Sequence, residues 1–207
     1  MGEWCMSEFQ QRAHELINSG KQLYTAGMLP ATSGNLSARL SDNSLAITIS
    51  GAHKGFLTEN DIMRVDINGA SFDGRKSSAE TLLHTYIYHR YPSVNVVLHP
   101  HSINSTVLSK FCKDNLILQG YELLKAFSGI NTHEYSMQVP VFENDQDIKR
   151  LATVIDEYIK KKEVVHGYLI RGHGFYTWGK NIDEALRHVE AFEFLFKCEL
   201  KFQGSGL

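Results

Sequence analysis

The sequence predicts a mixed α/β layer structure in a single domain covering residues 1–207. Three observations predict it. Apolar residues at helical spacing alternate along the chain with short β-rich runs. A length of 207 residues suits one domain, and no linker, repeat or low-complexity segment divides the chain. Hydrophobic residues make up 43% and charged residues 21%, so a sizeable core can form without disulfide or metal staples.

The first third of the chain is expected to hold one helix and two strands. Residues 7–27 carry apolar side chains at roughly helical spacing, and Gly27 is a natural end for the helix. Residues 30–37 are small and polar, which predicts a loop. Short β-rich runs at 45–50 and 63–67 predict strands, because each ends at a glycine-containing turn.

The middle of the chain alternates between helical spacing of apolar residues and short apolar or β-rich runs typical of strands. Residues 78–90 show one apolar helical face, and 94–98 form the nearly continuous apolar run of a buried strand. A helix at 103–111 and a short helical turn at 121–127 are expected next. A strand at 139–142 follows.

The last third predicts two helices that flank two strands. Residues 148–159 are amphipathic, and 182–200 form the clearest helical pattern of the chain. Between them, 164–170 and 175–178 are expected to be strands.

Charge and cysteine usage narrow the function classes. The net charge of -2 and the pI near 6.5 leave no basic surface for nucleic acid. Cys5, Cys112 and Cys198 form no CxxC pair, so neither a disulfide framework nor a thiolate zinc site is indicated. The N-terminus lacks the pattern of a signal peptide, and no stretch approaches the ~18 apolar residues of a membrane span. We expect a cytoplasmic protein with no membrane partner.

A pair of histidines ends the buried strand at 94–98. His99 and His101 are two residues apart, so both side chains can point to one ion from the same face of a strand. Catalytic zinc commonly has three protein ligands and an open position. His173, between Gly172 and Gly174, is the expected third ligand. The alternative is a chance pair in a chain with ten histidines.

Three short segments carry small donors that suit a phosphate. Hydroxyl groups and free N–H groups at a helix start make an anion site, to which a lysine adds charge. Each segment could instead be an ordinary turn, or the N-cap of the helix in the case of Ser78. The expected phosphate-binding residues are Ser33, Gly34, Asn35, Ser50, Gly51, Lys54, Ser77 and Ser78.

Two glutamates are candidates for a general base. Glu80 follows the serine pair, and Glu122 lies in the predicted helical turn. Each could equally be a solvated helix carboxylate, since the chain has 23 acidic residues.

Taken together and in this order, the motifs resemble the class II aldolase/adducin family over about residues 10–200. The motifs are Ser33-Gly34-Asn35, Ser50-Gly51, Ser77-Ser78 with Glu80, His99 with His101, and His173. Within the family, the chain is most similar to a dehydratase branch. That similarity rests on the segments at 30–35, 50–55, 78–84, 120–126, 141–147 and 176–179. Pro100 departs from the threonine that is more usual between the two histidines.

The resemblance implies a three-layer αβα fold with a central, mostly antiparallel sheet. It also implies one zinc ion per subunit and a homotetramer with active sites near subunit boundaries. The implied reaction is removal of water from a ketose 1-phosphate that bears a methylthio group, in methionine salvage. Glu122 is the implied base and Glu80 its support, although Glu80 is the acid/base in related aldolases. The alternatives are an aldolase or 4-epimerase, and a non-catalytic adducin-like module.

Overall fold

An eight-stranded sheet forms the middle layer of the molecule, in a computed structural model that describes residues 6–162 and 164–204. The strand order is β3-β2-β1-β4-β8-β7-β6-β5, and every neighbouring pair is antiparallel except β6 and β7. The strands are β1 (Asn35–Arg39), β2 (Leu45–Thr48), β3 (Ile62–Val65), β4 (Val96–His99), β5 (Asn115–Gln119), β6 (Ser136–Phe142), β7 (Gly167–Ile170) and β8 (Gly174–Gly179).

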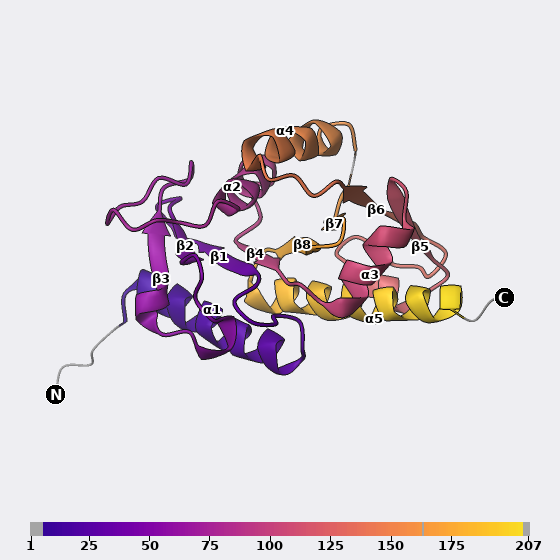
Figure 1. The fold of residues 1–207 in the computed structure, drawn as a ribbon, viewed down its shortest axis with the longest axis horizontal. Helices are drawn as coiled ribbons and strands as arrows, with labels where there is room; N and C mark the ends of the chain where they lie inside the picture. The colour runs from indigo at the N-terminus through magenta and orange to yellow at the C-terminus, as the bar shows by residue number, and fades with distance from the viewer. Residues whose placement is uncertain (1–5, 163, 205–207) are drawn as a thin grey trace.

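Helices cover both faces of this sheet, as Figure 1 shows, so the three-layer αβα arrangement is confirmed. One face carries α2 and α4, and the opposite face carries α1, α3 and α5. The helices are α1 (Glu8–Thr25), α2 (Thr81–Arg90), α3 (Ile103–Phe111), α4 (Ile148–Ile159) and α5 (Ile182–Gly204), with 3-10 turns η1 (Lys54–Phe56), η2 (Glu59–Asp61) and η3 (Glu122–Ala126).

Each sheet face has its own hydrophobic core, because successive strand residues point to opposite faces. In β4, Val96 and Leu98 join the core under α1 and α5, whereas Val97 joins the core under α2 and α4. Strand β4 is therefore packed against a hydrophobic core on both of its faces. The histidine that ends this strand therefore starts from a rigid position.

Side-chain caps begin several of the helices. Ser7 forms a capping box with Gln10 at the start of α1. Ser102 caps α3 by accepting the Ser105 N–H, and Asp147 caps α4 by accepting the Arg150 N–H. The predicted helix at 103–111 has the same bounds in the structure.

Several elements differ from the sequence predictions. Strand β6 begins three residues before its predicted start and β7 three residues after its predicted start. The segment 30–37 is not all loop, because β1 begins at Asn35. Strand β5 (Asn115–Gln119) was not predicted at all. The helix predicted from residue 78 begins only at Thr81, and Ser78 instead accepts the Glu80 N–H in the turn before it, at 3.3 Å. That turn leaves Glu80 free to point toward β4.

Some expectations depend on residues outside the described ranges. Cys5 and nearly all of the N-terminal segment lie there. Within the described part, Cys112 and Cys198 are free thiols. No helix of that part is both long and apolar enough to cross a membrane.

Candidate metal centre

Three histidines and one glutamate converge at one end of β4. One ligand atom each from Glu80, His99, His101 and His173 lies within 4.8 Å of the other three. The Nε2 atoms of His99 and His101 are 2.8 Å apart, and His173 Nε2 lies 3.3 Å from a Glu80 carboxylate oxygen. The two predicted histidines and the predicted third ligand therefore meet in space, although His101 and His173 are 72 positions apart in the sequence.

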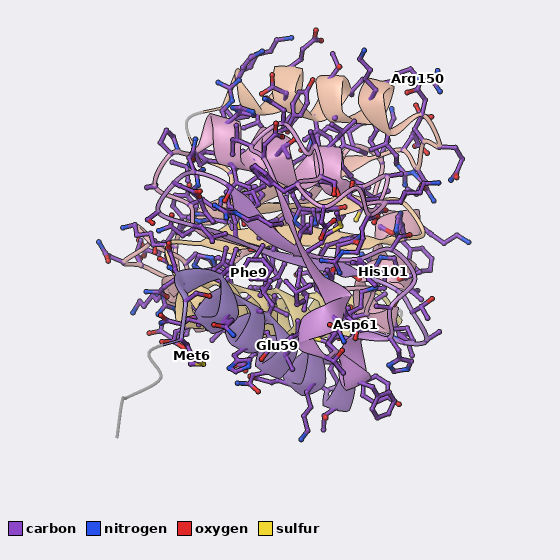
Figure 2. The ribbon with its side chains drawn as sticks, turned by 90° about the vertical axis from the view of Figure 1, so that its left-hand side faces the viewer. Met6, Phe9, Glu59, Asp61, His101 and Arg150 are labelled. Carbon is purple, nitrogen blue, oxygen red and sulfur yellow. The ribbon has the colours of Figure 1, made fainter. Side chains whose placement is uncertain are left out.

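Backbone contacts fix where the first two histidines stand. His99 is the last residue of β4 and pairs with Asn35 of β1. After Pro100, His101 donates its backbone N–H to the Met28 carbonyl at 2.8 Å. Figure 2 shows His101 at the height of the sheet, well away from Arg150 of α4.

The third histidine is placed by a close approach of two chain segments. His173 lies in the turn between β7 and β8, and its carbonyl accepts the Thr106 hydroxyl at 2.9 Å. A Cβ atom on Gly174 would stand 2.4 Å from the Pro100 carbonyl oxygen and 3.0 Å from the His101 ring. Only glycine lets β8 start this close to the histidine pair.

The tautomer of His99 is set by the backbone. Its Nδ1 lies 2.8 Å from the Phe175 carbonyl oxygen, so Nδ1 carries the proton and Nε2 presents a lone pair to the cluster. The Tyr176 ring stacks on the imidazole with centroids 3.9 Å apart and planes 10° apart. His99 is therefore oriented as a metal ligand by contacts that involve no metal.

Burial sets the charge state of the four groups. It lowers the pKa of His99 well below the usual range, lowers the pKa of His101 to about 3, and also lowers the pKa of His173. Burial raises the pKa of Glu80, against the Asn35 amide and the Lys54 charge, which favour the carboxylate. Neutral imidazoles beside a carboxylate are the form in which these side chains bind a metal.

This donor set suits a divalent cation. Three imidazole nitrogens and one carboxylate oxygen match the ligands of zinc and also of other first-row divalent ions. The fixed tautomer of His99, and the close approach of Gly174 to the histidine pair, also suit the binding of a divalent cation.

The predicted phosphate segments also come together, beside the cluster. Lys54 Nζ donates to the Thr32 and Ala52 carbonyls at 3.0 and 2.8 Å, which joins the first two segments. Ile49 forms a β-bridge with Ser77, which brings in the third. The Asn35 amide then donates to Glu80, so the first segment also contacts the metal centre.

Glu122 stands apart from this cluster. Its side chain is 72% exposed in η3, where it pairs with Lys125 at 2.6 Å and lies 3.8 Å from His133. Within residues 6–162 and 164–204, no hydrogen bond or ion pair links Glu122 to a residue of the metal centre.

Sequence reasoning missed two parts of the site. It treated Glu80 as an acid or base and not as part of the ligand set, because nothing in the sequence shows that α2 starts beside the end of β4. It also missed Phe175 and Tyr176, which orient His99. The contact of Phe175 uses its backbone carbonyl, which every residue type has, so the sequence could not predict it. The aromatic side chain of Tyr176, three residues after His173, was a signal that the sequence did offer.

The fold and the site define a metal-binding protein of the class II aldolase type. The family model for the class II aldolase and adducin N-terminal domain matches residues 14–200, and the chain belongs to this family.

Two relatives named methylthioribulose-1-phosphate dehydratase are similar over nearly their whole length. The protein from Methylococcus capsulatus is 58% identical over 198 residues, which cover 96% of this chain and 97% of the relative. The protein from Pseudomonas aeruginosa is 52% identical over 194 residues, covering 93% and 95%. Among solved structures, an L-fuculose 1-phosphate aldolase superposes with a TM-score of 0.79 at 26% identity, covering 100% of this chain and 92% of that one.

Proposed function

We propose that this chain is a methylthioribulose-1-phosphate dehydratase. It removes one water from 5-methylthioribulose 1-phosphate and gives 2,3-diketo-5-methylthiopentyl 1-phosphate in methionine salvage. The observation that carries the substrate assignment is 58% identity to a dehydratase across 97% of that relative. The convergence of Glu80, His99, His101 and His173 supports the chemistry.

Glu80, His99, His101 and His173 would hold one zinc ion per subunit. When bound, such an ion acts as a Lewis acid that makes the proton beside the substrate carbonyl more acidic. Glu80 also links the metal centre to β1, because its carboxylate accepts a hydrogen bond from the side-chain amide of Asn35. His99 is fully buried and His101 is partly buried, so the ligand atoms lie in a largely desolvated part of the chain.

Proton transfer is the step that the chain's own side chains must carry. We assign Glu122 as the base that removes the C3 proton, with Glu80 in support. The C4–oxygen bond then breaks, and the C4 hydroxyl leaves as water with one added proton. The resulting enol loses the proton of its C3 hydroxyl and takes up a proton at C4, which gives the 2,3-diketone, so atoms and charge balance.

The substrate phosphate would bind among the three segments joined at the mouth of the site. Gly34 and Gly51 both have φ of 77°, a conformation that suits turns with free N–H groups. The remaining donors are those of Ser33, Asn35, Ser50, Lys54, Ser77 and Ser78.

Glu122 lies outside the metal centre of its own chain, so its assignment as the base needs a second subunit that brings it to the site. We infer a homotetramer in which Glu122 enters the active site of a neighbouring chain. An open hollow surrounds Glu122, and Leu123 and Phe194 expose apolar surface beside it. Exposed apolar surface around a charged side chain suits a subunit contact. We place the assembled enzyme in the cytoplasm.

The test is to incubate zinc-loaded protein with methylthioribulose 1-phosphate and follow the products by mass. We expect a product lighter by one water. Cleavage into two fragments would instead make the chain an aldolase, an alternative favoured by the superposition on L-fuculose 1-phosphate aldolase. An intact substrate in the presence of bound metal would contradict both assignments.

A further inference from the structure

A row of side chains crosses the sheet beside the metal centre, on the face that α2 and α4 cover. Asn35 of β1 pairs with His99 of β4, and Tyr168 of β7 pairs with Tyr176 of β8. The Tyr176 ring stacks on the His99 ring, which joins the two pairs into one row. Both tyrosines also belong to the hydrophobic core under α2 and α4. The row therefore places Tyr176 against a metal ligand and Tyr168 one strand further away.

Three polar atoms of this region are buried without a hydrogen-bond partner among residues 6–162 and 164–204. They are the hydroxyl oxygens of Tyr168 and Tyr176 and the Nε2 atom of His84 on α2. The exposed fraction is 1% for Tyr168 and 0% for Tyr176 and His84. A buried polar atom that stays unpaired costs free energy, and in native proteins such atoms are nearly always bonded to protein or to internal water.

Ring contacts bring the three side chains together. The Tyr168 and Tyr176 rings are stacked, with centroids 4.9 Å apart and planes 18° apart. The His84 ring meets the Tyr176 ring edge-on at 5.5 Å, and its Nδ1 is already paired with the Ser37 hydroxyl at 2.7 Å. Two hydroxyls that bond to the same water can lie up to about 5.6 Å apart, twice the usual O–H···O length. Tyrosines stacked at this spacing suit one shared water, and no direct bond joins their hydroxyls.

Glu80 lies within electrostatic reach of both tyrosines. Burial raises the pKa of Tyr168 and of Tyr176 well above the usual range, and the negative charge of Glu80 acts in the same direction on each. Both hydroxyls therefore keep their protons at ordinary pH and can donate a hydrogen bond. The Glu80 carboxylate accepts the Asn35 amide and has lone pairs for further donors.

We propose that the three unpartnered atoms bind one internal water, which hydrogen-bonds to Glu80 and orients its carboxylate toward the three histidines. This water accepts from the two tyrosine hydroxyls and donates to Glu80 and to His84 Nε2, so all four of its hydrogen bonds are used. The tyrosines are positioning residues, because they act on the metal only through Glu80. Their role rests on the proposed metal site and does not depend on the identity of the substrate.

A high-resolution crystal structure of the metal-free protein tests the water site directly. We expect an ordered water about 2.7–3.0 Å from both tyrosine hydroxyls and from a Glu80 carboxylate oxygen. Hydroxyls that contact no ordered water, or that bond to Glu80 without one, overturn the water site.

Removal of one hydroxyl at a time tests the link to the metal. Tyr176→Phe and Tyr168→Phe keep the rings and remove one donor each. Each variant should weaken zinc binding by roughly 10-fold, the lower end of the range for a residue that orients a metal ligand, and should lower the urea midpoint of metal-free protein. Competition with a chromophoric chelator measures the zinc affinity. The double variant should weaken zinc binding by much less than the product of the single effects, because both hydroxyls hold the same water.

The matched control is Tyr86→Phe, because Tyr86 is a half-buried tyrosine of α2 that has no part in the water site. It should keep the zinc affinity and the urea midpoint of wild type.

The outcomes separate the role of the tyrosines from the dehydratase assignment. A lower urea midpoint with unchanged zinc affinity overturns the role, because the hydroxyls would then serve only the fold. A higher urea midpoint also overturns it, since that result is expected when a buried hydroxyl without a partner is removed. Wild-type protein that binds no zinc overturns it as well. Weaker zinc binding by both variants of a protein that fails to dehydrate the substrate supports the role and removes only the dehydratase assignment.

Discussion

The four side chains of the metal centre differ in burial and in the number of contacts that orient them. His99 is fully buried, its Nδ1 is bonded to the Phe175 carbonyl, and Tyr176 stacks on its ring. His173 has a 19% exposed side chain, and its buried Nδ1 has no hydrogen-bond partner among the described residues. His99 is therefore the ligand that the fold prepares best, and its loss should cost the most affinity.

Replacement of His99 by alanine should empty the site. We expect bound zinc to fall from one ion per chain to nearly none, and kcat/KM to fall by more than about 100-fold, the cost that even an outer contact of a metal site can reach. Metal analysis of the purified variant measures the first effect and the dehydration assay the second. His89→Ala, on the exposed side of α2, should change neither. A His99→Ala protein with a full complement of zinc would refute the ligand assignment.

Helix α2 is the element that carries Glu80 to the centre. A chain of buried polar contacts fixes this helix on β1: His84 Nδ1 lies 2.7 Å from the Ser37 hydroxyl, which lies 2.8 Å from the Tyr88 hydroxyl. Because burial lowers the pKa of His84 to about 3, the native state keeps this imidazole neutral at every ordinary pH. The free energy of unfolding therefore depends on pH through His84.

The sign of the pH effect follows from that lowered pKa. Below the unfolded-state pKa near 6.5, the unfolded chain takes up a proton at His84 and the native state does not. The free energy of unfolding therefore falls as the pH drops from about 6.5 toward 3, by about 1.4 kcal/mol per pH unit from this one group. Stability is fully present above this window.

Urea unfolding of metal-free protein at about pH 6 and pH 5 checks this effect. The His84→Gln variant should lose less stability than wild type between the two values, by about 1.4 kcal/mol. His89→Gln, whose side chain is exposed, should follow wild type. Equal losses in wild type and His84→Gln would show that His84 does not oppose protonation of the native state.

The elements that sequence could predict are those with strong periodicity. The amphipathic patterns of α3, α4 and α5 appear at nearly their predicted bounds. The prediction missed part of strand β1 because the strand carries two polar residues, Asn35 and Ser37. Both are buried, and each is hydrogen-bonded to a buried or partly buried side chain: Asn35 to Glu80 of the metal centre and Ser37 to His84 of α2. Strand β5 is short and lies beside turn-forming residues at 113–114, which hid its alternating burial.

At the scale of the whole molecule, the site depends on long-range pairing. His99 and His101 were predicted from their spacing, and His173 from its glycine setting. The place of Glu80 beside them depends on β1 lying next to β4, with Asn35 paired to His99. That register is a property of the sheet, and no local pattern in the sequence predicts it.

The inferred tetramer makes its own prediction about Glu122. Glu122→Gln and His101→Ala should each be inactive alone. When the two chains are co-expressed, sites that combine Glu122 of one chain with His101 of another should recover about a quarter of wild-type turnover, the share for random pairing. Native mass spectrometry confirms that mixed oligomers form. Mixed oligomers without activity would mean that Glu122 does not act across a subunit boundary.

The proposed activity depends on a metal held by Glu80, His99, His101 and His173. The most direct measurement is turnover of methylthioribulose 1-phosphate by chelator-treated protein as zinc is added back in steps. We expect negligible turnover without metal and a linear rise that stops at one zinc per chain. Full turnover in protein shown to contain no metal would contradict the role of the metal centre.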